Sequence, residues 1–198
     1  SVTGEFRRLC GERLAICWPV EADLVCGVPD SGNDAALGYA ERSLIRYEPR
    51  ALMKNWYSVR GRSFILPESD LRGETARRKN TATRSLVEGK RVVVVDDSLV
   101  RATTAPEIVK KLRLAGAKEI HLRIASPPVK YPCRYGIDMP NAEGSLASRL
   151  SLEELRAHCG ADSLGYLPLE EMRIIAARFI PSWCDACFSG EYPIPIVS

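Results

Sequence analysis

The feature that most constrains the fold is a run of four valines, residues 92–95, that ends in Asp96 and Asp97. A continuously apolar run of this length is typical of a strand in a parallel sheet that is covered on both faces. We therefore predict a buried strand over residues 90–97. The two carboxylates stand at its carboxyl end, where open α/β sheets bind their ligands.

The residues after this strand predict a helix and then a second strand. Thr104 and Glu107 form a T-x-x-E capping pattern, and Gly116 stands where a helix C-terminus favours glycine. Residues 118–126 are the next strand candidate, so the order is strand, helix, strand, and the sheet is predicted to be parallel. Further candidates are strands over 22–29 and 51–57, a helix over 5–17 and a helix that begins over 35–40.

Composition and charge exclude several classes of protein. The chain has 198 residues, a length that suits one domain with an appendage. Its net charge of +3 is too small to favour a nucleic-acid partner, and no apolar run approaches the roughly 20 residues of a membrane span. It has no signal peptide and opens on Ser1 without a methionine, so we expect a cytoplasmic protein and a fragment truncated at its N-terminal edge.

Residues 58–84 are polar, basic and weakly periodic. A stretch of this length without clear structure is more typical of a functional loop than of a packed element, so we predict a flexible loop here. Its basic residues are a candidate anion site, and a solvated charged surface is the simpler interpretation.

The turn between Asp97 and the following helix has the chemistry of a phosphate site. A helix N-terminus presents free N–H groups and the positive end of its dipole, and phosphate is the usual anion there. Adjacent carboxylates repel each other, which suggests compensation by a cation or by hydroxyl donors. These features favour a phosphorylated sugar with Mg²⁺, and solvated acids at a strand end are the alternative. The side-chain donors of the turn are Ser98, Arg101, Thr103 and Thr104.

A receiver domain is a rival interpretation of the same strand. Receivers also have an apolar strand that ends in an acidic pair, and Asp138 is a candidate for the phosphate-accepting aspartate. A receiver begins with its acidic strand, however, whereas about 90 residues precede this one. Neither a Walker A motif nor a G-x-G-x-x-G pattern after a strand is present.

The seven cysteines, in a chain without a secretion signal, argue against a disulfide framework. Cys184 and Cys187 form a C-x-x-C pattern near the C-terminus, and Cys133 lies upstream. These three thiols are a candidate metal site, one ligand short of a closed Cys₄ site.

The segment VVVVDDSLVRATT resembles the 13-residue phosphoribosyl pyrophosphate (PRPP) motif of type I phosphoribosyltransferases. The segments ADLVCGVPDSGNDAALGYA, LMKNWYSVRGRSFI and CDACFSGEYPIP narrow the resemblance to the transferase half of the glutamine PRPP amidotransferase family. The resemblance implies an α/β type I phosphoribosyltransferase fold: a mostly parallel sheet flanked by helices, with a flexible hood loop and an irregular C-terminal tail. It implies a phosphoribosyltransferase domain over 1–170 and a tail with the C-x-x-C pattern over 171–198.

The resemblance also implies an activity. Members of this family convert PRPP and ammonia to 5-phosphoribosylamine and pyrophosphate in purine biosynthesis, and a glutaminase domain supplies the ammonia from glutamine. That domain is missing here, so we expect at most ammonia-dependent activity. We also expect a homo-oligomer without nucleic-acid or membrane partners, and we assign no certain catalytic residue. The alternative is a catalytically impaired PRPP- or nucleotide-binding regulatory domain.

The resemblance implies binding roles residue by residue. Asp96 and Asp97 would bind Mg²⁺ together with Ser31 and would also contact the ribose hydroxyls. Lys54, Arg62 and Lys79 would close over the pyrophosphate. The PRPP loop corresponds to Asp96, Asp97, Ser98, Val100, Arg101, Ala102, Thr103 and Thr104. Ala102 stands where the family has glycine, and a Cβ so close to a phosphate argues against full activity.

The resemblance implies a second metal site. Cys133, Cys184 and Cys187 match three ligands of the [4Fe–4S] cluster found in one branch of the family. The fourth ligand in that branch lies before the point where this chain begins.

Overall fold

Four parallel strands form the main sheet, and their order decides which loops meet at its edge. The computed structural model describes residues 1–54, 80–99, 104–136 and 145–194. The strands lie in the order β1 (Leu24–Gly27), β4 (Arg91–Asp96), β5 (Glu119–Ile124) and β6 (Ser163–Tyr166). Val93 pairs with Val25 on one side and with His121 on the other, so the valine run lies inside the sheet, as predicted.

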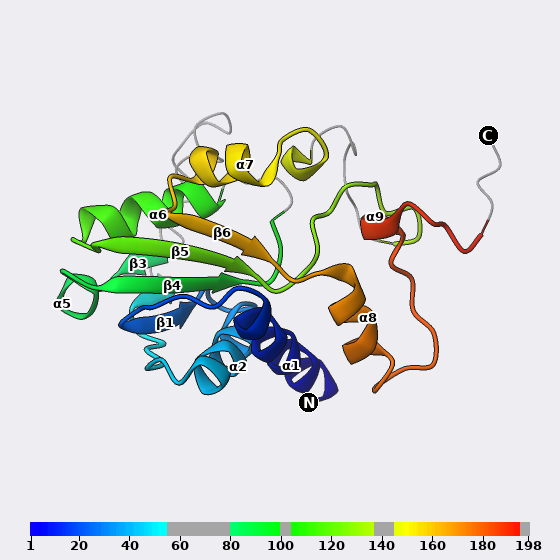
Figure 1. Ribbon diagram of the computed structural model, residues 1–198, viewed down its shortest axis with the longest axis horizontal. Helices are drawn as coiled ribbons and strands as arrows, with labels where there is room; N and C mark the ends of the chain where they lie inside the picture. The colour runs from blue at the N-terminus through cyan, green and yellow to red at the C-terminus, as the bar shows by residue number, and fades with distance from the viewer. Residues whose placement is uncertain (55–79, 100–103, 137–144, 195–198) are drawn as a thin grey trace, which may run out of the picture.

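Helices cover both faces of this sheet (Figure 1). One face carries α1 (Val2–Cys17), α2 (Asn33–Ser43) and α8 (Leu169–Ala176), and the other carries α6 (Thr104–Leu114) and α7 (Leu152–Cys159). Val93 and Val95 lie in the core with α1 and α2, whereas Val92 and Val94 lie in the core with α6. Every position of the run is apolar because both faces of the strand are buried.

The C-terminal end of α6 agrees with its sequence signal. Gly116 has a φ of +93°, and the N–H of Ala117 donates to the carbonyl of Leu112, so α6 ends where predicted. The start of α6 adjoins residues 100–103, which lie outside the described residues, so the predicted capping pattern at Thr104 and Glu107 stays a prediction. A complete capping box begins α7, between Ser151 and Glu154.

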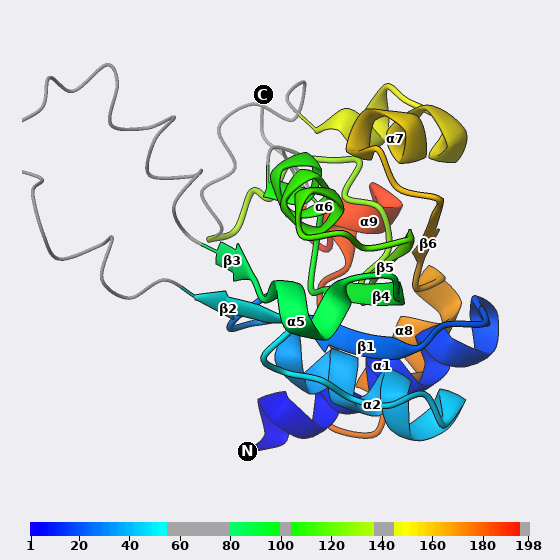
Figure 2. The ribbon, with the colours of Figure 1, turned by 90° about the vertical axis from the view of Figure 1, so that its left-hand side faces the viewer.

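A second sheet of two antiparallel strands lies apart from the main one (Figure 2). Lys54 of β2 (Leu52–Lys54) is opposite Asn80 of β3 (Asn80–Ala82), and α5 (Arg84–Val87) follows. The prediction of a loop over 58–84 is therefore wrong for residues 80–84, because a strand of three residues is too short to show a period. Lys111 Nζ donates a 2.8 Å hydrogen bond to the carbonyl of Asn80, and this bond links β3 to α6.

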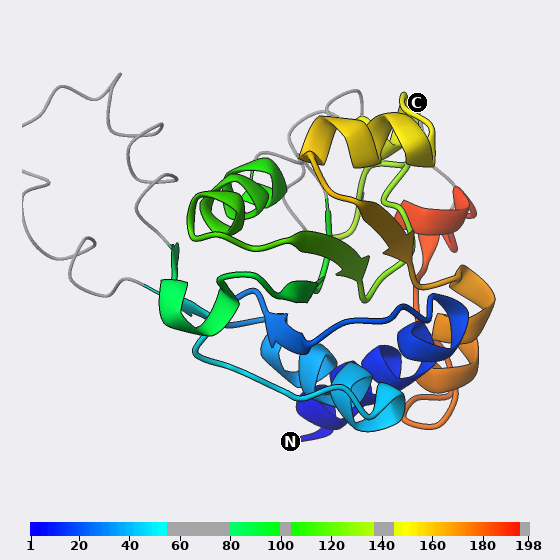
Figure 3. The same ribbon diagram turned by 60° about the vertical axis from the view of Figure 1, so that its left-hand side comes forward.

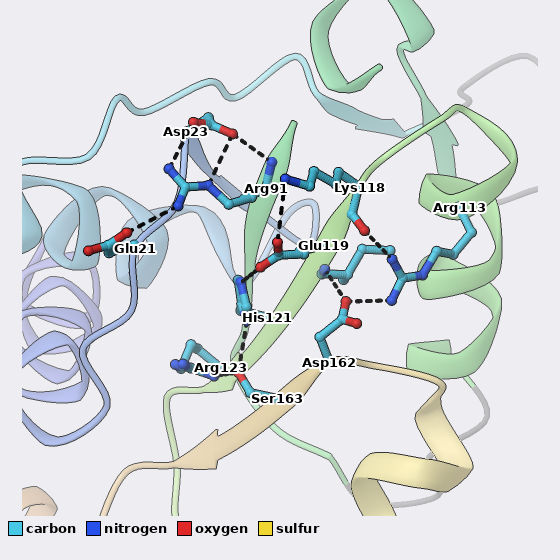
Figure 4. A network of polar contacts seen from close by, with 11 residues as sticks. Glu21, Asp23, Arg91, Arg113, Lys118, Glu119, His121, Arg123, Asp162 and Ser163 are labelled. Atoms are coloured by element: carbon cyan, nitrogen blue, oxygen red, sulfur yellow. Dashed lines mark hydrogen bonds and ion pairs between the residues drawn. The ribbon is translucent and has the colours of Figure 1, made fainter. Parts of the chain in front are cut away.

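The amino edge of the main sheet is fixed by ion pairs and hydrogen bonds (Figure 4). The Asp23 carboxylate accepts a 2.8 Å hydrogen bond from the Arg91 N–H and pairs with the Arg91 guanidinium at 3.2 Å. These contacts hold the pKa of Asp23 below its usual value. Asp162 accepts a 2.6 Å bond from the Ile120 N–H and pairs with Arg113, so the starts of β5 and β6 are tied to α6.

The chain after β6 lies at the opposite, carboxyl edge (Figure 3). There α8 is joined to α9 (Ala186–Ser189) by the ion pair between Arg173 Nε and Asp185 Oδ2, at 2.7 Å. The predicted domain boundary between residues 170 and 171 falls inside α8 and stays a prediction. Over the part of the chain that the structure describes, no helix has the length and apolar character needed to cross a membrane.

Candidate functional site

The predicted site lies where successive helices change from one face of the sheet to the other. The helix after β1, α2, packs on one face, and the helix after β4, α6, packs on the opposite face. Because β1 and β4 are neighbours, the loops that follow them diverge at the carboxyl edge, which is where open α/β sheets bind ligands. Ser31 follows β1, and Asp96 and Asp97 end β4, so the structure brings all three to this edge.

Asp96 is a buried carboxylate. It is 6% exposed, and its Oδ1 accepts a 2.9 Å hydrogen bond from the Asp97 N–H. Burial, and secondly the adjacent Asp97 carboxylate, raise the pKa of Asp96 from 3.8 to about 8. A bound cation would favour the charged form and offset this effect.

The loop after β1 lies directly against β4. The N–H of Val28 donates to the carbonyl of Val95 at 2.8 Å, and the N–H of Gly32 donates to the carbonyl of Val28 at 2.9 Å. A Cβ on Gly32 would lie 2.5 Å from the Val95 oxygen, so only glycine allows this approach. The Pro29–Asp30 peptide bond within the loop is cis. The loop thus holds Ser31 beside the end of β4.

Lys54 reaches the same edge from the second sheet. Its Nζ lies 2.5 Å from Oδ2 of Asp30, the residue before Ser31. Sequence reasoning did not single out Asp30, and the available signal was its place in the P-D-S-G segment. The ion pair joins the end of β2 to the loop after β1.

Two further predicted residues lie close in the chain to Asp97. Ser98 is half-buried, and Thr104 is exposed at the start of α6. The other predicted PRPP residues lie outside the described residues: Arg62, Lys79, Val100, Arg101, Ala102 and Thr103.

Two of the predicted cluster ligands lie at or just before α9, and Cys133 is near Cys187. The carbonyl of Cys187, in α9, accepts hydrogen bonds from the N–H groups of Lys130 and Tyr131, at 2.9 and 3.0 Å. Burial raises the pKa of the Cys187 thiol, and the nearby Cys133 and Cys184 raise it further. None of the seven cysteines, all of which lie in the part of the chain that the structure describes, forms a disulfide.

The two predicted metal sites fit the described residues to different degrees. Among those residues, no group of three or more His, Cys, Asp or Glu side chains is placed to hold a metal ion. Mg²⁺ does not require such a group, because it is usually bound through one or two carboxylates plus substrate phosphates and water. The oxygen donors of Asp96, Asp97 and Ser31 therefore suit Mg²⁺, whereas ligation of an iron–sulfur cluster stays a prediction.

An apolar pocket lies elsewhere, between the start of α1 and the residues after α8. Phe6 and Phe179 meet there edge to face, with ring centroids 6.0 Å apart. The pocket offers no charged group to an anionic substrate, so we do not assign the site to it. It is lined by Val2, Thr3, Phe6, Ala176, Phe179, Ile180 and Trp183.

The known proteins that are similar to this chain agree in their descriptions. The amidophosphoribosyltransferase of Bacillus subtilis is 49% identical over 194 residues, which are 96% of this chain and 40% of that protein. A solved structure described as the allosteric regulatory enzyme of purine biosynthesis superposes with a TM-score of 0.85 at 47% identity, over 98% of this chain and 42% of that one. The glutamine PRPP amidotransferase of B. subtilis in complex with ADP and GMP gives a TM-score of 0.83 at 48% identity, over 96% and 42%. No family model matches the chain.

The fold prediction is confirmed by these structures, which share the mostly parallel sheet flanked by helices. The chain spans only about a third to two fifths of the length of the curated relatives it matches. The chain is therefore homologous to the C-terminal part of the amidophosphoribosyltransferases.

Proposed function

We propose that this chain carries the phosphoribosyl-transfer site of an amidophosphoribosyltransferase, which converts PRPP and ammonia to 5-phosphoribosylamine and pyrophosphate. The observation that carries the proposal is the carboxyl edge of β1 and β4, where Ser31, Asp96 and Asp97 meet in a chain 49% identical to a protein of that name. The description of a related structure as a purine-biosynthesis enzyme supports the same pathway.

The reaction is a displacement at the anomeric carbon. The ammonia nitrogen forms a bond to that carbon, the bond to the pyrophosphate oxygen breaks, and the nitrogen then loses one proton to give the neutral amine. Positive charge develops on the sugar, so carboxylates beside the ribose stabilise the transition state. Asp96 and Asp97 supply the compensating negative charge, and they accept hydrogen bonds from the ribose hydroxyls.

The remaining residues of the site position the two phosphate ends of PRPP. The N-terminus of α6, with Ser98 and Thr104, is suited to the 5′-phosphate, and Lys54 is suited to the pyrophosphate. Positioning of this kind lowers the barrier without a covalent nucleophile. Asp96, Asp97 and Ser31 would hold Mg²⁺, which neutralises charge on the departing pyrophosphate.

Pyrophosphate release from PRPP in MgCl₂ and a high concentration of ammonium tests the proposal. We expect release that requires all three components and that glutamine does not support in place of ammonium. If PRPP binds in calorimetry but no pyrophosphate is released, the chain is a binding domain without turnover. The compared proteins give that alternative no support, since each is described as a transferase or an enzyme.

We propose further that Cys133, Cys184 and Cys187 provide three ligands of a [4Fe–4S] cluster. Their nearness supports this assignment, and the fourth ligand would come from outside the chain. Anaerobic reconstitution with iron and sulfide should give visible absorbance and about four irons per chain when an external thiol is supplied. Cys184→Ser should abolish this absorbance, whereas Cys10→Ser, at a thiol buried in α1, should leave it unchanged.

The remaining proposals concern the domains of the chain, its source of ammonia, its assembly and its location. We propose a phosphoribosyltransferase domain over 1–170 and a tail over 171–198, a glutaminase domain as the source of ammonia, a homo-oligomeric assembly and a cytoplasmic location. The short span of the chain relative to its relatives supports the glutaminase partner.

A further inference from the structure

One ion pair at the site involves a lysine that the substrate would also need. The Lys54 ammonium, which the proposed function assigns to the pyrophosphate, lies 2.5 Å from the Asp30 carboxylate. The Lys54 side chain is 33% exposed and that of Asp30 is 61% exposed, so both can exchange partners with solvent and solutes. A pyrophosphate that binds Lys54 must therefore replace Asp30 or share the ammonium with it.

The surroundings of the pair favour an exchange of side-chain partners over a movement of the strands. Lys54 is opposite Asn80 in the β2–β3 ladder, and the carbonyl of Asn80 accepts a hydrogen bond from Lys111 of α6. Asp30 precedes Ser31 and Gly32, and Gly32 is packed against the backbone of β4. Both backbones are therefore held by other contacts when the ion pair opens.

We propose that Asp30 is an internal competitor of pyrophosphate for Lys54. It holds the lysine side chain at the carboxyl edge of β1 in the free protein, gives it up when the pyrophosphate group binds, and takes it back when pyrophosphate leaves. Asp30 thus weakens the binding of both PRPP and the product, and it favours product release. This inference rests on the proposed function, because it requires a pyrophosphate group at Lys54.

The test is the affinity for inorganic pyrophosphate, measured by calorimetry with MgCl₂ on four proteins: wild type, Asp30→Asn, Lys54→Met and the double variant. Exposed ion pairs of this kind are weak, so Asp30→Asn should tighten pyrophosphate binding about two- to five-fold. In the Lys54→Met background the same change should have an effect below about 1.5-fold, because the contested ammonium is gone. Asp30→Glu, which keeps the charge, should retain the wild-type affinity.

Asp34→Asn is the matched control, since it removes one negative charge from the first turn of α2, next to the same loop. An equal gain in Asp34→Asn would mean that net charge alone matters, and it would overturn the proposal. So would unchanged or weaker binding in Asp30→Asn with an unchanged melting temperature. A wild-type protein that binds neither pyrophosphate nor PRPP would instead overturn the proposed function, and this inference with it.

Discussion

Asp96→Asn is expected to reduce Mg²⁺-dependent pyrophosphate release at least about 100-fold and, at the same time, to make the metal-free protein more stable above pH 8. The loss follows because the amide carries no charge for Mg²⁺ or for the developing positive charge on the ribose. The gain in stability follows because the wild-type Asp96 carboxyl is 6% exposed and lies next to Asp97, so that charging it in the folded protein is costly. The amide removes this cost.

The direction of the pH effect comes from the two pKa values. The pKa of Asp96 is about 8 in the folded protein and 3.8 for the unperturbed group, which represents the unfolded chain. Between these values the folded state binds more protons than the unfolded state, so the free energy of unfolding falls as the pH rises. The contribution of Asp96 is fully present below pH 3.8 and is lost as the pH passes through about 8.

Urea unfolding in EDTA, from pH 5 to pH 9, checks this result. The difference in free energy of unfolding between Asp96→Asn and wild type should grow over this range and level off above pH 8, at a few kcal/mol as an order of magnitude. Asp97→Asn is the matched variant: it should also impair pyrophosphate release, but its gain in stability should be smaller because Asp97 is only half-buried. A flat difference for Asp96→Asn would show that this carboxylate is not charged at a cost in the folded protein.

The carboxyl edge could be predicted from the sequence because its signals are local. Four valines in succession are explained only by burial on both faces, so the strand and the position of Asp96 at its end follow directly. The C-x-x-C pattern likewise singled out Cys184 and Cys187 without any tertiary information. The identity of the substrate came from the resemblance, since local chemistry alone led to a phosphorylated sugar.

Other parts of the fold depend on distant contacts that no local pattern encodes. The ion pair between Lys54 and Asp30 joins the end of β2 to the loop after β1 across 24 positions of the chain, and nothing near either residue indicates the other. The three residues of β3 are a strand only because β2 lies beside them. In contrast, the S-x-x-E pattern at Ser151 and Glu154 is a local signal for the start of α7. The pattern was overlooked in the sequence, so this helix was not predicted.

Gly38→Ala and Gly11→Ala are expected to cause large losses of stability at the α1–α2 interface. A Cβ on Gly38 of α2 would lie 1.9 Å from the carbonyl oxygen of Arg8 in α1, and a Cβ on Gly11 of α1 would lie 1.9 Å from the carbonyl oxygen of Ala35. Both obstacles are helix backbone, which cannot rotate away as a side chain can, so the two helices must separate. Such overpacking costs about 1–3 kcal/mol or more, equivalent to a fall of roughly 3–10 °C in melting temperature for a chain of this size.

Thermal unfolding of Gly38→Ala, Gly11→Ala and Gly4→Ala measures this interface. Gly4, in α1 like Gly11, is the control: the nearest atom to its Cβ would be Asp34 Oδ2 at 3.3 Å, the end of a side chain, and alanine is the better helix former. Gly4→Ala should therefore leave the melting temperature unchanged or raise it. Because α2 begins two residues after Ser31, its displacement in Gly38→Ala should also weaken PRPP binding. An unchanged melting temperature for Gly38→Ala would mean that α1 and α2 lie farther apart than the structure places them, and the loop that holds Ser31 would then lack this support.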